Sequence, residues 1–177
     1  GARSRSKFVA GIFPVHALSG LFVAALVCLF YGFAHGQTLG DALNAPDRVW
    51  TTGGTNGWSV TTNISVDGVA SVESSTGQNP SENWIQTTNA ASQAVTFWWK
   101  FYTPVSNIDS LELYAGTNLL AGCSNTIDWK PRSVLLPAGE QVVTWKLLRR
   151  NGSTFYSAQG WIDQVSFGPA LTPSFLL

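Results

Sequence analysis

Two carboxylates that face each other across a groove are sufficient for glycoside hydrolysis, and this sequence holds four candidate acids. Glycosidases place such a pair of acids about 5–10 Å apart. No two of the candidates have a diagnostic spacing, and they are Asp109, Glu112, Asp128 and Asp163. A glycoside-processing enzyme is therefore an alternative that the sequence leaves open without favouring it.

Histidine is confined to one end of the chain. Its only two histidines, His16 and His35, lie within the first 36 residues. The remaining residues therefore cannot build a Ser-His-Asp triad, a Cys-His pair or a histidine-based zinc site. They also contain no Walker-type or dinucleotide-binding glycine motif. We predict that the protein is not an enzyme and that it needs no cofactor.

Asp163 is the most informative single acid. The two-residue alternation of a strand places it on one face with a tryptophan, a valine and a phenylalanine. A carboxylate in such an apolar layer is costly unless it is paired or hydrogen-bonded. We expect backbone donors, or an arginine such as Arg48 or Arg132, to satisfy it. The alternative is a calcium ligand, but calcium takes about six to eight oxygens and no Asp-rich loop supplies them.

Aromatic side chains are abundant, with eight tryptophans in 177 residues. Large rings contribute strongly to cores, and we expect Trp99, Trp145 and Trp161 to pack there. The remaining rings could instead form a platform on which the flat apolar faces of sugars stack.

The best platform candidates are Trp98 and Tyr102, which lie four residues apart on one strand face. Lys100 stands between them, and Tyr114 is a potential neighbour. The next candidates, which lie near predicted loops, are Trp58 and Trp84. A second layer or another chain could equally cover this face.

The sequence beyond residue 37 alternates short β-type runs with turn-forming clusters and shows no helical period. This pattern predicts an all-β protein with two antiparallel sheets, a β-sandwich of the jelly-roll type. The predicted strands are 48–52, 58–62, 69–73, 83–88, 93–102, 109–115, 129–136, 141–149 and 160–167. On strand 93–102 the inward row is predicted to be Val95, Phe97, Trp99 and Phe101, so the adjacent Trp98 must point outward.

The N-terminal segment has the features of an export signal. Arg3, Arg5 and Lys7 precede an apolar run at 18–34, and residues 34–36 offer a small-x-small cleavage site. We predict a signal peptide at 1–36, a β-sandwich domain at 37–168 and a linker-like tail at 169–177. An uncleaved anchor, which would touch the membrane only through residues 8–34, is the alternative. Either segment predicts a secreted or cell-surface protein.

Charge and cysteine content restrict the partners. Removing the three basic residues of the signal from the ten in the chain leaves seven against ten acidic residues, a net charge of about −3. No basic stripe is present, so nucleic acid is not an expected partner. Cys123 is the only cysteine beyond residue 36, which excludes an internal disulfide there. We expect it to be a small buried hydrophobe, the alternative being a bridge to another chain.

Several segments resemble the second half of MAM-type, concanavalin-like jelly-roll modules and related repeats of large secreted bacterial surface proteins. They are VTFWWKF at 95–101, LEL at 111–113, Trp129, VLLPAG at 134–139, VTW at 143–145 and GWIDQV at 160–165. Trp50 and Trp58 suit the start of such a module, so the resemblance covers about residues 39–168. It implies a two-sheet jelly roll used for adhesion, self-association or carbohydrate binding. MAM domains carry disulfides that this chain cannot form, which favours the bacterial relatives.

Together these observations predict a non-catalytic extracellular β-sandwich that serves adhesion or carbohydrate binding. Its expected partners are a polysaccharide or other glycan, or neighbouring domains of a surface protein. A structural or self-association module within a larger assembly is the alternative.

Overall fold

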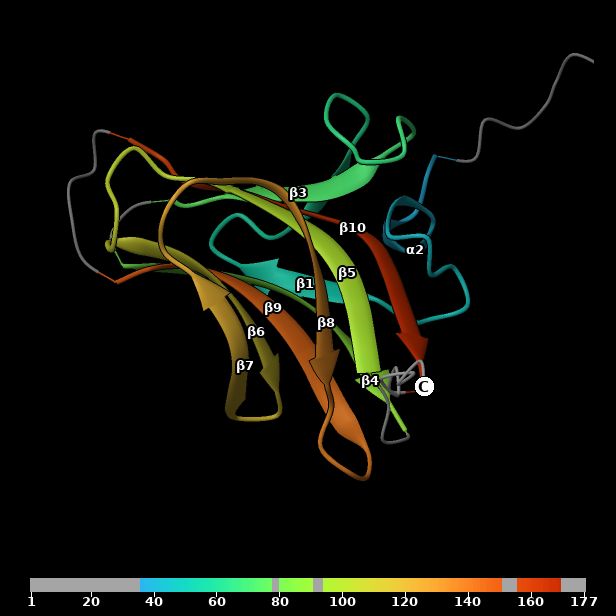
Figure 1. Ribbon diagram of the computed structural model, residues 1–177. Helices are drawn as coiled ribbons and strands as arrows, with labels where there is room; N and C mark the ends of the chain where they lie inside the picture. Colours follow the sequence, from blue (N-terminus) through green and yellow to red (C-terminus); the bar gives the residue numbers. More distant parts are fainter. Residues whose placement is uncertain (1–35, 78–79, 91–93, 151–155, 170–177) are drawn as a thin grey trace, which may run out of the picture. The chain divides into compact units, whose positions relative to one another are not determined.

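The computed structural model describes residues 36–77, 80–90, 94–150 and 156–169. Within the compact unit Gln37–Leu177 these residues form a β-sandwich of two five-stranded antiparallel sheets (Figure 1). The predicted all-β fold is therefore confirmed. The described part of the chain contains no helix that is both long and apolar enough to cross a membrane. The predicted signal peptide, apart from Gly36, and tail residues 170–177 lie outside the described residues.

The first sheet, which we call sheet A, has the strand order β1-β4-β9-β6-β7. Its strands are β1 (Thr51–Gly54), β4 (Ser81–Asn89), β9 (Gln141–Arg149), β6 (Asp109–Ala115) and β7 (Asn118–Cys123). The second sheet, sheet B, has the order β2-β3-β10-β5-β8. Its strands are β2 (Ser59–Thr61), β3 (Ser71–Ser75), β10 (Gln159–Gly168), β5 (Ala94–Tyr102) and β8 (Ile127–Leu135). Non-consecutive neighbours in both sheets mean that the chain crosses repeatedly between the two layers.

All nine predicted strands are present, and β7 is an additional strand. Its sequence, NLLAGC, contains no β-branched or aromatic residue, so propensity gave no signal for it. The two-residue loop Gly116-Thr117 folds β7 back on β6, and Gly116 has the positive φ of 56° that a tight hairpin needs. Pairing with β6 therefore forms this strand rather than its own composition.

One helical turn, α2 (Leu39–Ala42), precedes the first strand and was not predicted. Thr38 and Asp41 form a capping box in which each side chain binds the other residue's backbone N–H. A single turn is too short to show a helical period, so alternation analysis could not find it.

The core lies between the sheets. The predicted inward row of β5 is confirmed, because Val95, Phe97, Trp99 and Phe101 are each at most 1% exposed. Phe97 meets Trp99 and Trp145 edge-on, with ring centroids 5.4 Å apart in both pairs.

Trp161 differs from the expectation that it packs in the core. It is only 4% exposed. Its neighbour Ile162 points into the core, and successive side chains of a strand alternate, so Trp161 lies on the outer face of sheet B. Its indole Nε1 donates to Glu73 Oε2 of the adjoining strand at 3.0 Å. The side chain is therefore buried by neighbours on its own sheet rather than by the opposite sheet.

Candidate functional site

The four candidate acids are divided between the two sheets. Asp109 and Glu112 point to opposite faces of sheet A, Asp109 with the buried row of β6 and Glu112 away from it. Asp128 and Asp163 lie in sheet B, where Asp128 is exposed and Asp163 is fully buried. Among the described residues, no group of three or more His, Cys, Asp or Glu side chains could hold a metal ion.

Asp163 is satisfied by backbone donors, one of the two arrangements expected. Its carboxylate accepts hydrogen bonds of 2.7 Å from Val66 N and from Gln164 N. Burial raises the pKa of the carboxyl group, and these two bonds oppose that shift. The arginines suggested as partners have other contacts, since Arg48 stacks on the Phe167 ring and Arg132 lies over the Trp99 ring.

The six candidate residues of the aromatic platform lie in three places, namely the outer face of sheet B, the outer face of sheet A and the core between the sheets. Trp98, Lys100 and Tyr102 share the outer face of sheet B, with Tyr102 46% exposed and Lys100 ion-paired to Asp128 at 2.7 Å. Tyr114 lies on β6 of sheet A, so it is not their neighbour.

The two loop candidates also differ in position. Trp58 is 5% exposed and belongs to the core cluster, which corrects its assignment as a ligand platform. It precedes β2, where alternation gave no direction for its ring. Trp84 is half-buried on the outer face of sheet A, two strands from Tyr114. Sheet A thus gathers two of the six candidate residues on one surface.

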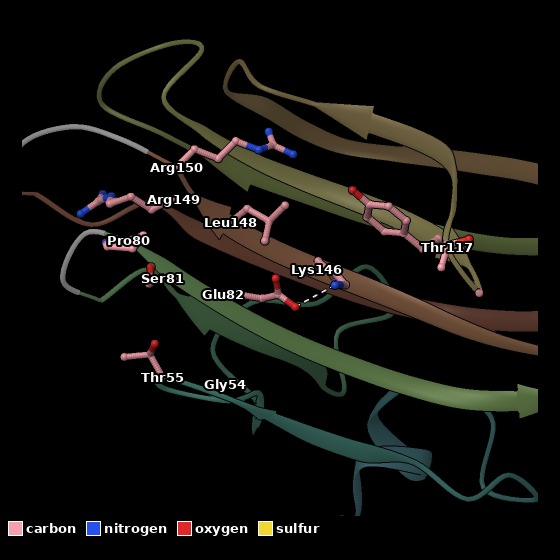
Figure 2. A pocket seen from close by; sticks show the side chains of 12 residues that line it. Gly54, Thr55, Pro80, Ser81, Glu82, Thr117, Lys146, Leu148, Arg149 and Arg150 are labelled. Carbon is pink, nitrogen blue, oxygen red and sulfur yellow. Dashed lines mark hydrogen bonds and ion pairs between the residues drawn. The ribbon is translucent and has the colours of Figure 1, made fainter.

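A groove runs across this outer face. It consists of a hollow of about 1050 Å³ beside Tyr114 and an adjoining hollow of about 260 Å³ beside Trp84. The two hollows share Glu82, Gly116 and Lys146, and together we call them the sheet A groove. Figure 2 shows Glu82 and Lys146 pointing toward each other in the larger hollow, where their side chains form an ion pair of 2.7 Å.

The register of the ladder positions the aromatic rings. Trp84 of β4 is the direct cross-strand partner of Gly53 on β1 and of Lys146 on β9. The indole of Trp84 packs over Gly53, because a Cβ atom on Gly53 would overlap the indole carbons. The absence of a side chain at Gly53 therefore sets the position of the Trp84 ring.

A hydrogen-bonded network fixes the other ring. Tyr114 Oη donates to Glu112 Oε2, while Ser110 Oγ and Arg150 Nη2 each bind Glu112 Oε1 at 2.8 Å. Burial acts to raise the pKa of Glu112, but the hydrogen bonds from Tyr114, Ser110 and Arg150 outweigh it and lower the pKa. The same bond to Glu112 raises the pKa of Tyr114. At neutral pH Glu112 is therefore a carboxylate that accepts a hydrogen bond from the neutral phenol of Tyr114. Lys146 Nζ lies 5.3 Å from the centroid of the Tyr114 ring.

This arrangement suits recognition of a ligand rich in hydroxyl groups. The two rings come from β4 and β6, and Lys146, which forms an ion pair with Glu82, lies on β9 between these strands. Rings provide apolar contact, and the charged pair provides hydrogen-bond donors and acceptors. The partnership of Lys146 with Glu82 and the packing of Trp84 on Gly53 depend on strand pairing and had no sequence signal.

The packing of Trp84 on Gly53 predicts the effect of G53A. The new methyl group should displace the indole, shift the tryptophan emission to longer wavelength and lower the free energy of unfolding by about 1–3 kcal/mol. G168A is the matched control, because a Cβ atom there meets nothing within 4 Å. The emission shift should vanish in a W84A background, whereas a shift that persists there would show that Trp84 does not rest on Gly53.

Comparison with known proteins identifies the fold but not the family. No family model matches the sequence, and no curated protein matches it. The secreted serine protease VesC from Vibrio cholerae matches with a TM-score of 0.50 and 16% identity over 64% of this chain. The chain spans only 24% of VesC.

Modules of adhesion and sugar binding also match. The K2 cleaved adhesin domain of Lys-gingipain matches with a TM-score of 0.52 and 16% identity, covering 67% of this chain and 87% of that domain. The module TmCBM61, solved with β-1,4-galactotriose, reaches a TM-score of 0.49 and 16% identity, covering 76% and 96% of the two chains. The likeness is one of fold. The resemblance to MAM-type modules is not confirmed.

Proposed function

We propose that the protein is a non-catalytic, exported glycan-binding module and that it binds its glycan in the sheet A groove. The observation that carries this proposal is the pair of rings, Trp84 and Tyr114, placed on either side of the Lys146–Glu82 ion pair. Small-molecule sites are concave, and aromatic side chains line them together with a few placed polar groups. Aromatic and polar side chains both line the sheet A groove.

Other observations support the proposal. The scattered positions of Asp109, Glu112, Asp128 and Asp163 favour binding over hydrolysis, which needs two acids at one groove. The K2 domain is an adhesin domain and VesC is secreted, in agreement with a module that works outside the cell. Adhesion then follows from glycan binding. The hydrophobic N-terminal sequence supports export.

The test is the affinity for a panel of soluble polysaccharides. Truncating a central aromatic contact costs about 2 kcal/mol, so W84A and Y114A should each weaken binding roughly tenfold to hundredfold. The control is W129A, which removes a half-buried tryptophan of β8 that does not line the groove. Equal losses in W84A and W129A would contradict the proposed site. If the wild type binds no polysaccharide, the structural or self-association function replaces this one.

A further inference from the structure

The opposite face of the sandwich carries a separate hollow. Its volume is about 430 Å³, and it lies on the outer face of sheet B, between β10, β5 and β8. We call it the Trp98 hollow, and besides Trp98 its polar lining residues are Thr96, Arg132, Ser133 and Gln164. It shares no lining residue with the sheet A groove.

The backbone beside Trp98 is irregular. Asp163 pairs with Trp98 and Ser166 pairs with Thr96, so two residues of β10 stand opposite one residue of β5 and form a β-bulge. Gln164 lies in this bulge with φ of 50°, a left-handed conformation that a residue with a side chain rarely adopts. Bulges and strained residues concentrate at binding sites, where they redirect a side chain. Here the bulged residue is Gln164, which lines the Trp98 hollow.

Buried contacts hold this conformation before any ligand arrives. The carboxylate of Asp163, which is fully buried, accepts the backbone N–H of Gln164 at 2.7 Å. The next backbone N–H, that of Val165, donates to Leu43 O at 2.8 Å. The bulge is therefore fixed from behind, and a preorganised site loses less entropy when it binds.

We infer that the Trp98 hollow is a second glycan-binding site, so that one module can bridge two glycan chains. Trp98 offers a half-buried indole, and the hydroxyl and amide side chains beside it match the hydroxyls of a sugar ring. Tyr102 lies on the same face four residues further along β5 and extends the surface. This inference rests on the proposed function in its choice of ligand, but it concerns residues on the other sheet.

The experiment is calorimetric titration of the protein with β-1,4-linked hexasaccharides of glucose, xylose, mannose and galactose. The wild type should take up close to two oligosaccharides per chain, and W98A and W84A should each take up close to one. The W84A/W98A double variant should take up none. Long polysaccharides of the same linkage should show increased light scattering with the wild type but with neither single variant, because bridging requires both sites.

A second variant separates binding from folding. Glycine adopts a φ of 50° without strain, so Q164G should unfold at the same or a higher temperature than the wild type. It lacks the amide, so it should bind at the Trp98 hollow at least fivefold more weakly. A merely structural glutamine would leave this affinity unchanged, and that result would contradict a role in binding.

The two proposals fail in different ways. One oligosaccharide per wild-type chain, retained in W98A and lost in W84A, would overturn the second site alone. Binding that W98A abolishes and W84A spares would overturn the sheet A groove alone. If no oligosaccharide binds and sedimentation shows an oligomer that W98A dissociates, the Trp98 face is a contact between copies of the chain, and both proposals are wrong.

Discussion

Replacing Asp109 by alanine should lower the free energy of unfolding by about 3–5 kcal/mol, because the substitution leaves a buried guanidinium without its counter-ion. Both side chains of the Asp109–Arg149 pair are 0% exposed. The guanidinium approaches the carboxylate as a fork, with Nε 2.9 Å from Oδ1 and Nη2 3.4 Å from Oδ2. Urea unfolding followed by tryptophan fluorescence would measure the loss.

The control is the surface ion pair of the groove. Glu82 and Lys146 are 48% and 29% exposed, so E82Q should cost no more than about 1 kcal/mol. The double variant D109L/R149M replaces the buried pair by apolar residues of similar volume and should recover much of the stability. A loss in D109A as small as that in E82Q would mean that water reaches the guanidinium, contrary to its burial.

The buried pair also supports the proposed site. Arg149 Nη1 donates to Gly77 O at 3.2 Å and to Tyr156 O at 2.8 Å, so it ties two other segments to the sheet. Arg149 is one of the residues at the end of the larger hollow, and in Figure 2 its side chain points away from Glu82 and Lys146. D109A should therefore weaken glycan binding more than its distance from the rings would suggest. In W129A, whose side chain lies outside the groove, affinity should change little.

Local alternation was sufficient to predict the sandwich but not the site. The rows on β5, β6 and β9 are long enough for the two-residue period to show which side chains face inward. Trp58 was a surface candidate because it begins predicted strand 58–62, next to a predicted loop, whereas the structure places it in the core just before β2. Tyr114 was placed on the wrong surface for another reason. Alternation shows that it points outward, but the assignment of strands to sheets depends on crossovers far apart in the sequence.

Contacts between distant residues explain what else was missed. The groove depends on Glu82 meeting Lys146 and on Gly53 lying under Trp84, and both depend on register. Asp163 was predicted to need hydrogen bonds because its burial follows from its strand face. One of its donors, Val66, lies 97 residues away, and no local pattern identifies it.

Replacing Trp145 by alanine should have the other large effect, a loss of about 3–5 kcal/mol in the free energy of unfolding. Trp145 is 0% exposed and meets Phe97 edge-on and Trp50 at a tilt, with centroids 5.4 and 5.9 Å away. Its removal leaves a cavity between the sheets that a close-packed core cannot fill by small movements. Since natural domains have only about 5–15 kcal/mol of stability, W145A should unfold well below the wild-type temperature.

Two further variants make this prediction specific to the core. W145F keeps most of the ring contact and removes an indole N–H that has no acceptor among the described residues, so it should lose much less stability than W145A. W84A removes the same side chain from a half-buried surface position and should lose less stability than W145A. Glycan binding should distinguish the two variants. W145F should bind like the wild type because its folded protein retains the groove, whereas W84A should bind more weakly. Equal destabilisation by W145A and W84A would mean that Trp84 is a core residue, which would remove it from the proposed binding surface.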